Sequence, residues 1–103
     1  MSELPTRKDF LESLNTKFRV FFDGEQPTEV ELTDVSELRP KPRYEAYSLV
    51  FVAPKSIQPM QMLYRVEHDT LGMMELFLVP FEENEKGFAF EALFNQRINV
   101  SGD

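Results

Sequence analysis

Residues 62–79 read MLYRVEHDTLGMMELFLV, and the architecture of the chain is clearest in this stretch. Large apolar side chains occupy every second position on both sides of a polar segment that ends at Gly72. A period of two is typical of a β-strand that buries one face, and a cluster of Asp, Thr and Gly between two such runs indicates a turn. The stretch therefore predicts a β-hairpin, with strands at about 60–67 and 73–80.

The side chains of this hairpin also predict its register. One arrangement places apolar residues opposite one another on one face and opposite charges on the other. A shift by one residue would destroy both relationships, because it exchanges the two faces of a strand. The predicted pairs are Met62–Leu78, Tyr64–Leu76, Val66–Met74 and Arg65–Glu75.

The same alternation recurs along the rest of the chain. Further strands are predicted at about 17–22, 28–35, 44–52 and 88–95. The first two of these flank an Asp23-Gly24 turn and form a second hairpin with the same division into an apolar and a charged face. Its predicted pairs are Phe22–Thr28, Val20–Val30, Phe18–Leu32 and Arg19–Glu31.

A short helix is predicted to precede the strands, at about residues 6–15. The Thr6 hydroxyl can accept a hydrogen bond from the Asp9 amide, and Asn15 can close the helix. The chain is thus expected to be one domain, residues 1–103, that is mainly β. The short N-terminal helix is followed by about six antiparallel strands that form a small barrel or a compact β-roll, and residues 97–103 form a frayed tail.

The composition of the chain narrows the range of possible functions. The chain has no cysteine, which excludes disulfides and thiolate metal sites and favours a cytoplasmic location. A net charge of −7 disfavours binding to nucleic acid or to an anionic membrane surface. There is no apolar run of the length that spans a bilayer, and the N-terminus lacks the pattern of a signal peptide.

Residues 64–80 match a known pattern, Y-R-V-E-H-x-x-L-G-x-x-x-L-F-L-V-P. Other matching segments are Asp9-Phe10, Phe18 to Val20, Val35 to Leu38, Tyr47 to Phe51 and Phe90 to Asn95. In these segments the chain resembles a family of short bacterial proteins defined only as a domain of unknown function. The resemblance implies a shared fold and a link to phage-tail-like assemblies, and it carries over no catalytic residue.

The sequence offers no set of residues for catalysis, for a metal or for a cofactor. The only histidine, His68, lies between two acids and is expected to shape a β-turn through hydrogen bonds to nearby backbone. A glycine-rich phosphate loop and a His-Glu-x-x-His zinc motif are both missing from the sequence. We therefore expect a protein that is not an enzyme and that uses no cofactor.

The side of the predicted hairpin that should face water carries an apolar stripe, which continues onto the strand at 88–95 if Leu78 lies opposite Ala92. Its members are Leu63, Phe77, Val79 and Leu93. Exposed apolar surface of this kind marks a contact site, so something is expected to cover it. One candidate is the chain's own helix, through Phe10, Leu11 and Leu14; the other is a second subunit or a partner protein.

A basic docking loop is a further candidate surface, formed by Arg39, Lys41 and Arg43, which alternate with two prolines. These features favour the hypothesis that the protein is a non-enzymatic protein-interaction or accessory structural module. Such a module would bind a protein partner or associate with itself. The alternative is a barrel that binds a small molecule or carbohydrate at one mouth. The sequence alone does not exclude a small-molecule ligand. The residues expected to line that mouth are Tyr44, Tyr47 and Tyr64.

Overall fold

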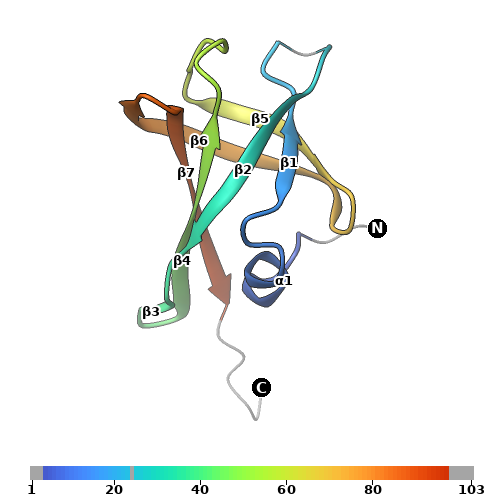
Figure 1. The fold of residues 1–103 in the computed structure, drawn as a ribbon. Coiled ribbons are helices and arrows are strands. Elements are labelled where there is room, and N and C mark those ends of the chain that lie inside the picture. The colour runs from blue at the N-terminus through green and yellow to red at the C-terminus, as the bar shows by residue number, and fades with distance from the viewer. Residues whose placement is uncertain (1–3, 24, 98–103) are drawn as a thin grey trace.

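The computed structural model describes residues 4–23 and 25–97, and this part of the chain forms one short helix and seven strands (Figure 1). In chain order the elements are α1 (Arg7–Glu12), β1 (Lys17–Val20), β2 (Thr28–Val35), β3 (Arg39–Pro40), β4 (Tyr44–Ala53), β5 (Met62–His68), β6 (Gly72–Asn84) and β7 (Gly87–Arg97). The predicted fold class, mainly β with a short N-terminal helix, is confirmed. Beyond Arg97, the predicted tail lies outside the described residues, as does Gly24 of the predicted turn.

The strands close into a barrel. They run in the order β2-β1-β5-β6-β7-β4-β3, all neighbours are antiparallel, and a further pairing of β2 with β4 joins the two sides. Six strands therefore enclose the core, and β3 lies outside the ring against the start of β4. Closure satisfies backbone groups that an open sheet would leave at its edges.

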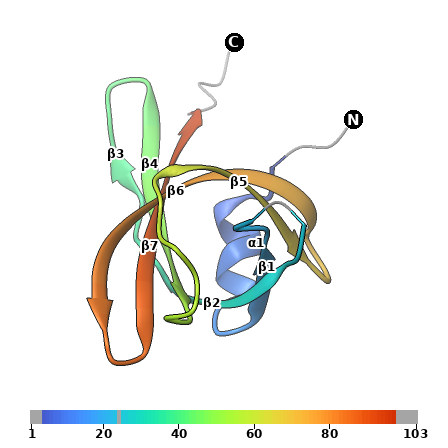
Figure 2. The same cartoon turned by 90° about the horizontal axis from the view of Figure 1, so that it is seen from above.

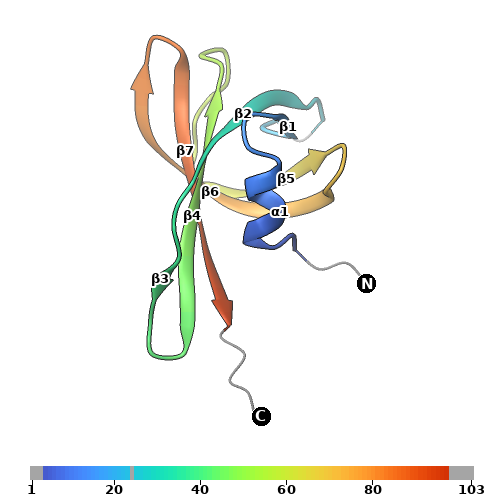
Figure 3. The ribbon, with the colours of Figure 1, turned by 60° about the horizontal axis from the view of Figure 1, so that its bottom comes forward.

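The molecule is elongated along β4 and β7, which pair from Tyr44 opposite Arg97 to Ala53 opposite Phe88. The hairpin of β3 and β4 and the hairpin of β6 and β7 lie at opposite ends of this ribbon (Figure 3). The first of these hairpins projects from the barrel as an arm.

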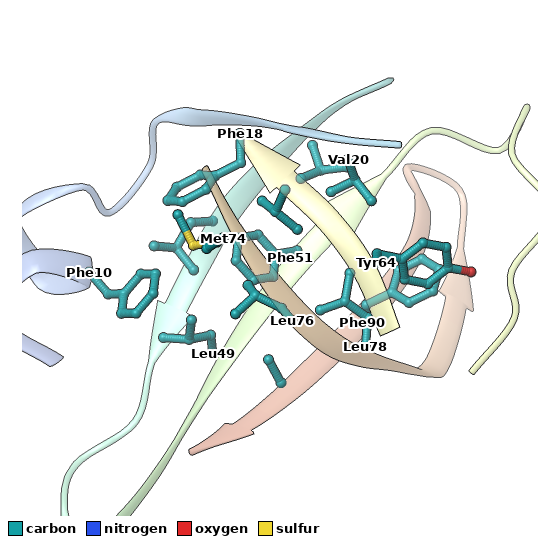
Figure 4. Close-up of a cluster of buried hydrophobic side chains, with 14 of the residues drawn as sticks. Phe10, Phe18, Val20, Leu49, Phe51, Tyr64, Met74, Leu76, Leu78 and Phe90 are labelled. Carbon is teal, nitrogen blue, oxygen red and sulfur yellow. The ribbon is translucent and has the colours of Figure 1, made fainter. Parts of the chain in front are cut away.

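Inward-facing side chains fill the barrel (Figure 4). The largest fully buried side chains are those of Phe10, Phe18, Phe51, Phe90, Leu32, Leu49, Leu78, Val20, Val30 and Val66. The predicted register of β5 and β6 is confirmed in full, including Arg65 opposite Glu75. Met62 was expected in the core, but it is 41% exposed because it is the first residue of β5 and lies at the end of the strand.

The helix begins as the sequence predicts. Thr6 Oγ1 accepts a hydrogen bond from the Asp9 amide at 3.2 Å, and Asp9 Oδ2 accepts one from the Thr6 amide at 2.9 Å. The helix ends at Glu12, earlier than expected, and Asn15 adopts the left-handed conformation with φ 67°. This early end turns the chain into β1 after less than two turns of helix.

Helix α1 lies in the curve formed by β1, β5 and β6 (Figure 2). Its one buried residue, Phe10, points into the barrel core. The ring of Phe10 lies 6.4 Å from that of Phe18 on β1 and 5.4 Å from that of Phe94 on β7, measured between centroids. The helix thus closes one end of the core from within, rather than packing on the outside of the sheet.

The predicted register of the hairpin of β1 and β2 is wrong by two residues. Phe18 pairs with Val30, and Val20 pairs with Thr28. The pairing of β1 with β2 ends at Val20, and the amide of Phe21 continues the pairing with β5 by donating to the carbonyl of Arg65 at 3.0 Å. The loop before β2 is therefore longer than the sequence suggested.

This shift also changes the charge pairs. Arg19 Nε lies 2.9 Å from Glu67 Oε1 on β5, and Arg19 Nη1 lies 3.0 Å from Asp69 Oδ1. Glu31, which was expected opposite Arg19, instead pairs with Lys17, with 3.9 Å between Lys17 Nζ and Glu31 Oε1. The predicted pairing of Arg19 with Glu31 is therefore incorrect.

Two prolines lie within strands where the sequence predicted an end or a loop. Strand β6 continues past Pro80 to Asn84, with a shift of register between Pro80 and Glu82. Pro40 belongs to the short strand β3, which the sequence analysis missed. Proline is tolerated at bulges and on edge strands, because no ladder hydrogen bond needs its missing N–H there.

Candidate interaction surface on the outer face of β5 and β6

The hairpin of β5 and β6 presents its odd-numbered residues on the outside of the barrel. Leu63 pairs with Phe77 across the two strands, and Arg65 pairs with Glu75. The even-numbered side chains point inward: those of Tyr64, Val66 and His68 on β5 and of Met74, Leu76 and Leu78 on β6 are buried, which fixes the direction of the outer side chains. An apolar pair and an opposite-charge pair therefore lie next to each other on one surface.

This apolar pair is open to solvent in the described part of the chain. Leu63 is 54% exposed and Phe77 is 49% exposed. The helix does not cover them, because Phe10 is directed into the core and Leu11 is itself exposed. The expectation that α1 lies across the stripe is therefore wrong.

The predicted stripe is divided in the structure. Leu63 and Phe77 are direct partners, whereas Val79 is half-buried and pairs with Glu91 on β7. Leu93 is 70% exposed, but its strand partner is Ser48 on β4. We call Leu63 and Phe77 the outer apolar pair, since no strand pairing links them to Leu93.

Phe21 adds to this surface, which the sequence analysis missed. The guanidinium carbon of Arg65 lies 4.3 Å from the centre of the Phe21 ring. A shallow groove of about 510 Å³ runs beside them. Its lining residues are Phe21, Phe22, Asp23, Met62, Leu63, Tyr64, Arg65 and Glu75. The available signal was the position of Phe21, an aromatic residue in phase with the polar side chains of Lys17 and Arg19.

The basic docking loop forms the tip of the projecting arm. Arg39 belongs to β3, and the amide of Lys41 donates to the carbonyl of Tyr44 at 2.9 Å, which closes the hairpin onto β4. Arg39, Lys41 and Arg43 are all exposed, and none forms an ion pair with a described residue. Three cations therefore lie together at one end of a chain with a net charge of −7.

His68 shapes the turn between β5 and β6, as expected. Its Nδ1 accepts hydrogen bonds from the amides of Thr70 at 3.1 Å and Leu71 at 3.2 Å. Its Nε2 lies 2.9 Å from Oγ1 of Thr16, whose hydroxyl donates to the carbonyl of Ser13 at 2.6 Å. Because Nδ1 accepts twice and the Thr16 hydroxyl is used as a donor, His68 is neutral with its proton on Nε2.

The surroundings of His68 favour this neutral form. Burial lowers the pKa of the His68 imidazole below its ordinary value, an effect that Asp69 opposes and Arg19 reinforces. The imidazole packs on the ring of Phe18, with 4.2 Å between centroids. Both ring nitrogens are occupied within the fold, so the arrangement serves structure and leaves no free base.

The three tyrosines do not line a common mouth. Tyr47 is buried and stacks on Phe94, with 5.1 Å between ring centroids. Tyr64 is buried elsewhere in the core, and its hydroxyl donates to the carbonyl of Met60 at 2.8 Å. Tyr44 lies exposed on the arm. The pocket that the ligand-binding alternative required is therefore not formed by these residues.

Comparison with known proteins supplies the family. The model of a family described as "Domain of unknown function (DUF6916)" matches residues 5–94, which run from just before α1 into β7. The chain belongs to the DUF6916 family. This confirms the resemblance to a family defined only as a domain of unknown function. No curated protein and no solved structure shows significant similarity to this DUF6916 chain.

Two further findings concern the described residues of the DUF6916 chain. Within residues 4–23 and 25–97, no group of three or more metal-ligating side chains is placed to hold a metal ion. The only helix in this part of the chain, α1, is too short to cross a membrane. The outer face of β5 and β6, with its exposed apolar pair, is thus the main candidate for a binding surface in the described residues.

Proposed function

We propose that this DUF6916 chain is a non-enzymatic protein-interaction module, and that it binds through the outer face of β5 and β6. The observation that carries the proposal is the outer apolar pair, Leu63 and Phe77, which α1 leaves uncovered. Exposed apolar side chains on a sheet face commonly mark contact sites when they adjoin one another. The flanking charges of Arg65 and Glu75 would then select the partner.

The strength of such a contact can be bounded. Fully burying a Leu or a Phe side chain contributes about 1.5–3 kcal/mol, so the exposed halves of both would contribute roughly the same amount together. This value alone is smaller than the cost of association. The partner must therefore also engage the neighbouring charges and the groove beside Phe21, and the complex should be reversible.

The acidic composition supports a protein partner over a nucleic acid, because a net charge of −7 repels phosphates. We place the protein in the cytoplasm on the strength of its cysteine-free sequence. A component of a phage-tail-like assembly is a specific partner to test, as the family resemblance suggests.

A matched pair of variants tests the proposal. Phe77→Glu puts a charge into the outer apolar pair, whereas Phe81→Glu makes the same change at a residue that is 53% exposed on β6 and lies beyond the last β5 partner, Leu78. Association is measured by light scattering and by capture of partners from an extract of the source cells. We expect Phe77→Glu to remain folded and lose association, and Phe81→Glu to keep it. Equal behaviour of the two variants would overturn the assignment.

A further inference from the structure

We infer that the occupant of the outer β5–β6 face is a second copy of the same chain, an inference that rests on the function proposed above. The face carries an apolar pair and a pair of opposite charges in one register. A surface that holds both signs of charge at matched positions can be complementary to itself. The pairing of β5 with β6 determines how two such surfaces would meet.

The register determines which residues would meet in such a dimer. A two-fold axis that runs parallel to the strands, between β5 and β6, places β5 of one copy over β6 of the other at the same height. Each cross-strand pair within one chain is then reproduced between chains. Leu63 would contact Phe77 of the second copy, and Phe77 would contact Leu63, as in any isologous interface.

The same operation pairs the charges. Arg65 and Glu75 are strand partners, so Arg65 of each copy would face Glu75 of the other. Both side chains are exposed, and within the described ranges neither forms an ion pair. The guanidinium of Arg65 is instead held over the ring of Phe21, which keeps it on this face. One dimer would contain two intermolecular ion pairs beside two apolar contacts.

The adjoining residues limit the contact to this part of the hairpin. Towards the turn, Met73 is 48% exposed, but its partner Glu67 is already bound to Arg19. Towards the other end, Val79 is the next outward residue of β6, and it is half-buried beside β7. A face of this size, on the convex outside of a barrel, corresponds to a small interface, so we expect a weak dimer that depends on concentration.

Charge reversal and mixing test this geometry. Arg65→Glu leaves two acids facing each other across the interface, and Glu75→Arg leaves two bases, so each variant alone should dimerise at least about tenfold more weakly than wild type. An equimolar mixture should form a heterodimer, because every contact between the chains is then attractive. Within each chain the like charges stay together, so recovery on mixing cannot come from repair of the fold.

Two controls accompany the mixture, and light scattering over a wide concentration range gives the mass. The double variant Arg65→Glu/Glu75→Arg restores both the internal and the intermolecular pairs and should dimerise as wild type does. Glu83→Arg reverses an exposed charge at the far end of β6 and should leave the dimer unchanged. Circular dichroism verifies that each variant is folded.

The outcomes separate this inference from the proposed function. Weak single variants whose mixture dimerises support the two-fold arrangement. Single variants that dimerise like wild type, or whose mixture does not recover, overturn it. A wild type that stays monomeric at every concentration overturns the second copy as occupant. If that monomer still captures a different protein in a manner that Phe77→Glu abolishes, the proposed function stands without the dimer.

Discussion

The Nε2 atom of His68 lies 2.9 Å from Oγ1 of Thr16, and this contact joins the turn of the β5–β6 hairpin to the segment between α1 and β1. The same ring accepts two backbone hydrogen bonds inside the turn through Nδ1. One side chain thus fixes both the local shape of the hairpin and its position against the helix. Protonation of Nδ1 would end its role as an acceptor, which makes this link sensitive to pH.

The free energy of unfolding should fall as the pH drops below about 6.5. The unfolded chain binds a proton at His68 near this value, whereas burial lowers the pKa of His68 in the folded chain. The folded state therefore binds fewer protons, so its stability is complete above the unfolded pKa and is lost as the pH falls through the folded pKa. Urea unfolding from pH 7.5 to about 5 measures the loss, above the range where most carboxylates titrate.

His68→Asn is the matched variant for this pH prediction. Its Oδ1 can still accept from the amides of Thr70 and Leu71, but the side chain does not titrate. We expect a lower stability at neutral pH, by about 1–3 kcal/mol, since the contacts with Thr16 and Phe18 are lost. The decline between neutral pH and pH 5 should be smaller than in wild type. Identical slopes for the two proteins would contradict a neutral His68.

Phe10→Ala should destabilise the fold by about 3–5 kcal/mol, because Phe10 is fully buried between β1 and β7 and its removal opens one end of the core. Leu11→Ala is the control on the same helix, at a position that is 38% exposed, and should cost less than about 1 kcal/mol. Thermal unfolding measures both. Similar losses of stability in the two variants would contradict the position of α1 at the end of the core with Phe10 buried.

Two glycines with positive φ make a second matched comparison. Gly72 has φ 84° and open space around it, so Gly72→Ala should cost only the backbone strain, about 1–2 kcal/mol. At Gly87, with φ 144°, an added Cβ would overlap the carbonyl oxygen of Ala53 on β4. Gly87→Ala should exceed the other cost by at least about 1 kcal/mol, because β7 must move away from β4. Urea unfolding that ranks the two in the opposite order would contradict this strand contact.

The register of β5 and β6 was predictable in full, and that of β1 and β2 was not, for a physical reason. In β5 and β6, His68 pairs with Gly72, so a short turn and two distinct faces leave a single register. In β1 and β2, a shift by two residues keeps every side chain on its own face. Only the length of the loop distinguishes the two registers, and local patterns do not reveal that β1 stops pairing with β2 at Val20.

The outer apolar pair was predictable from the sequence, but the rest of the candidate surface and its surroundings were not. Alternation places Leu63 and Phe77 on the outer face from sequence alone. Whether α1 covers them depends on where Phe10 packs, and its ring lies between Phe18 on β1 and Phe94 on β7. No local signal in the sequence encodes the contact with Phe94. The separation of Leu93 from the outer apolar pair has the same origin, since it depends on the partner of each part of β7.

The observed register predicts which acidic residue interacts with Arg19. The sequence pattern alone indicates a different residue, Glu31. Arg19 contacts Glu67 on β5 at 2.9 Å, whereas Glu31 pairs with Lys17. In double-mutant cycles with alanine, Arg19 and Glu67 should be coupled, with an interaction that weakens as salt is added, and Arg19 and Glu31 should be additive. Urea unfolding of the single and double variants gives both values. Coupling of Arg19 to Glu31 but not to Glu67 would restore the register shifted by two residues.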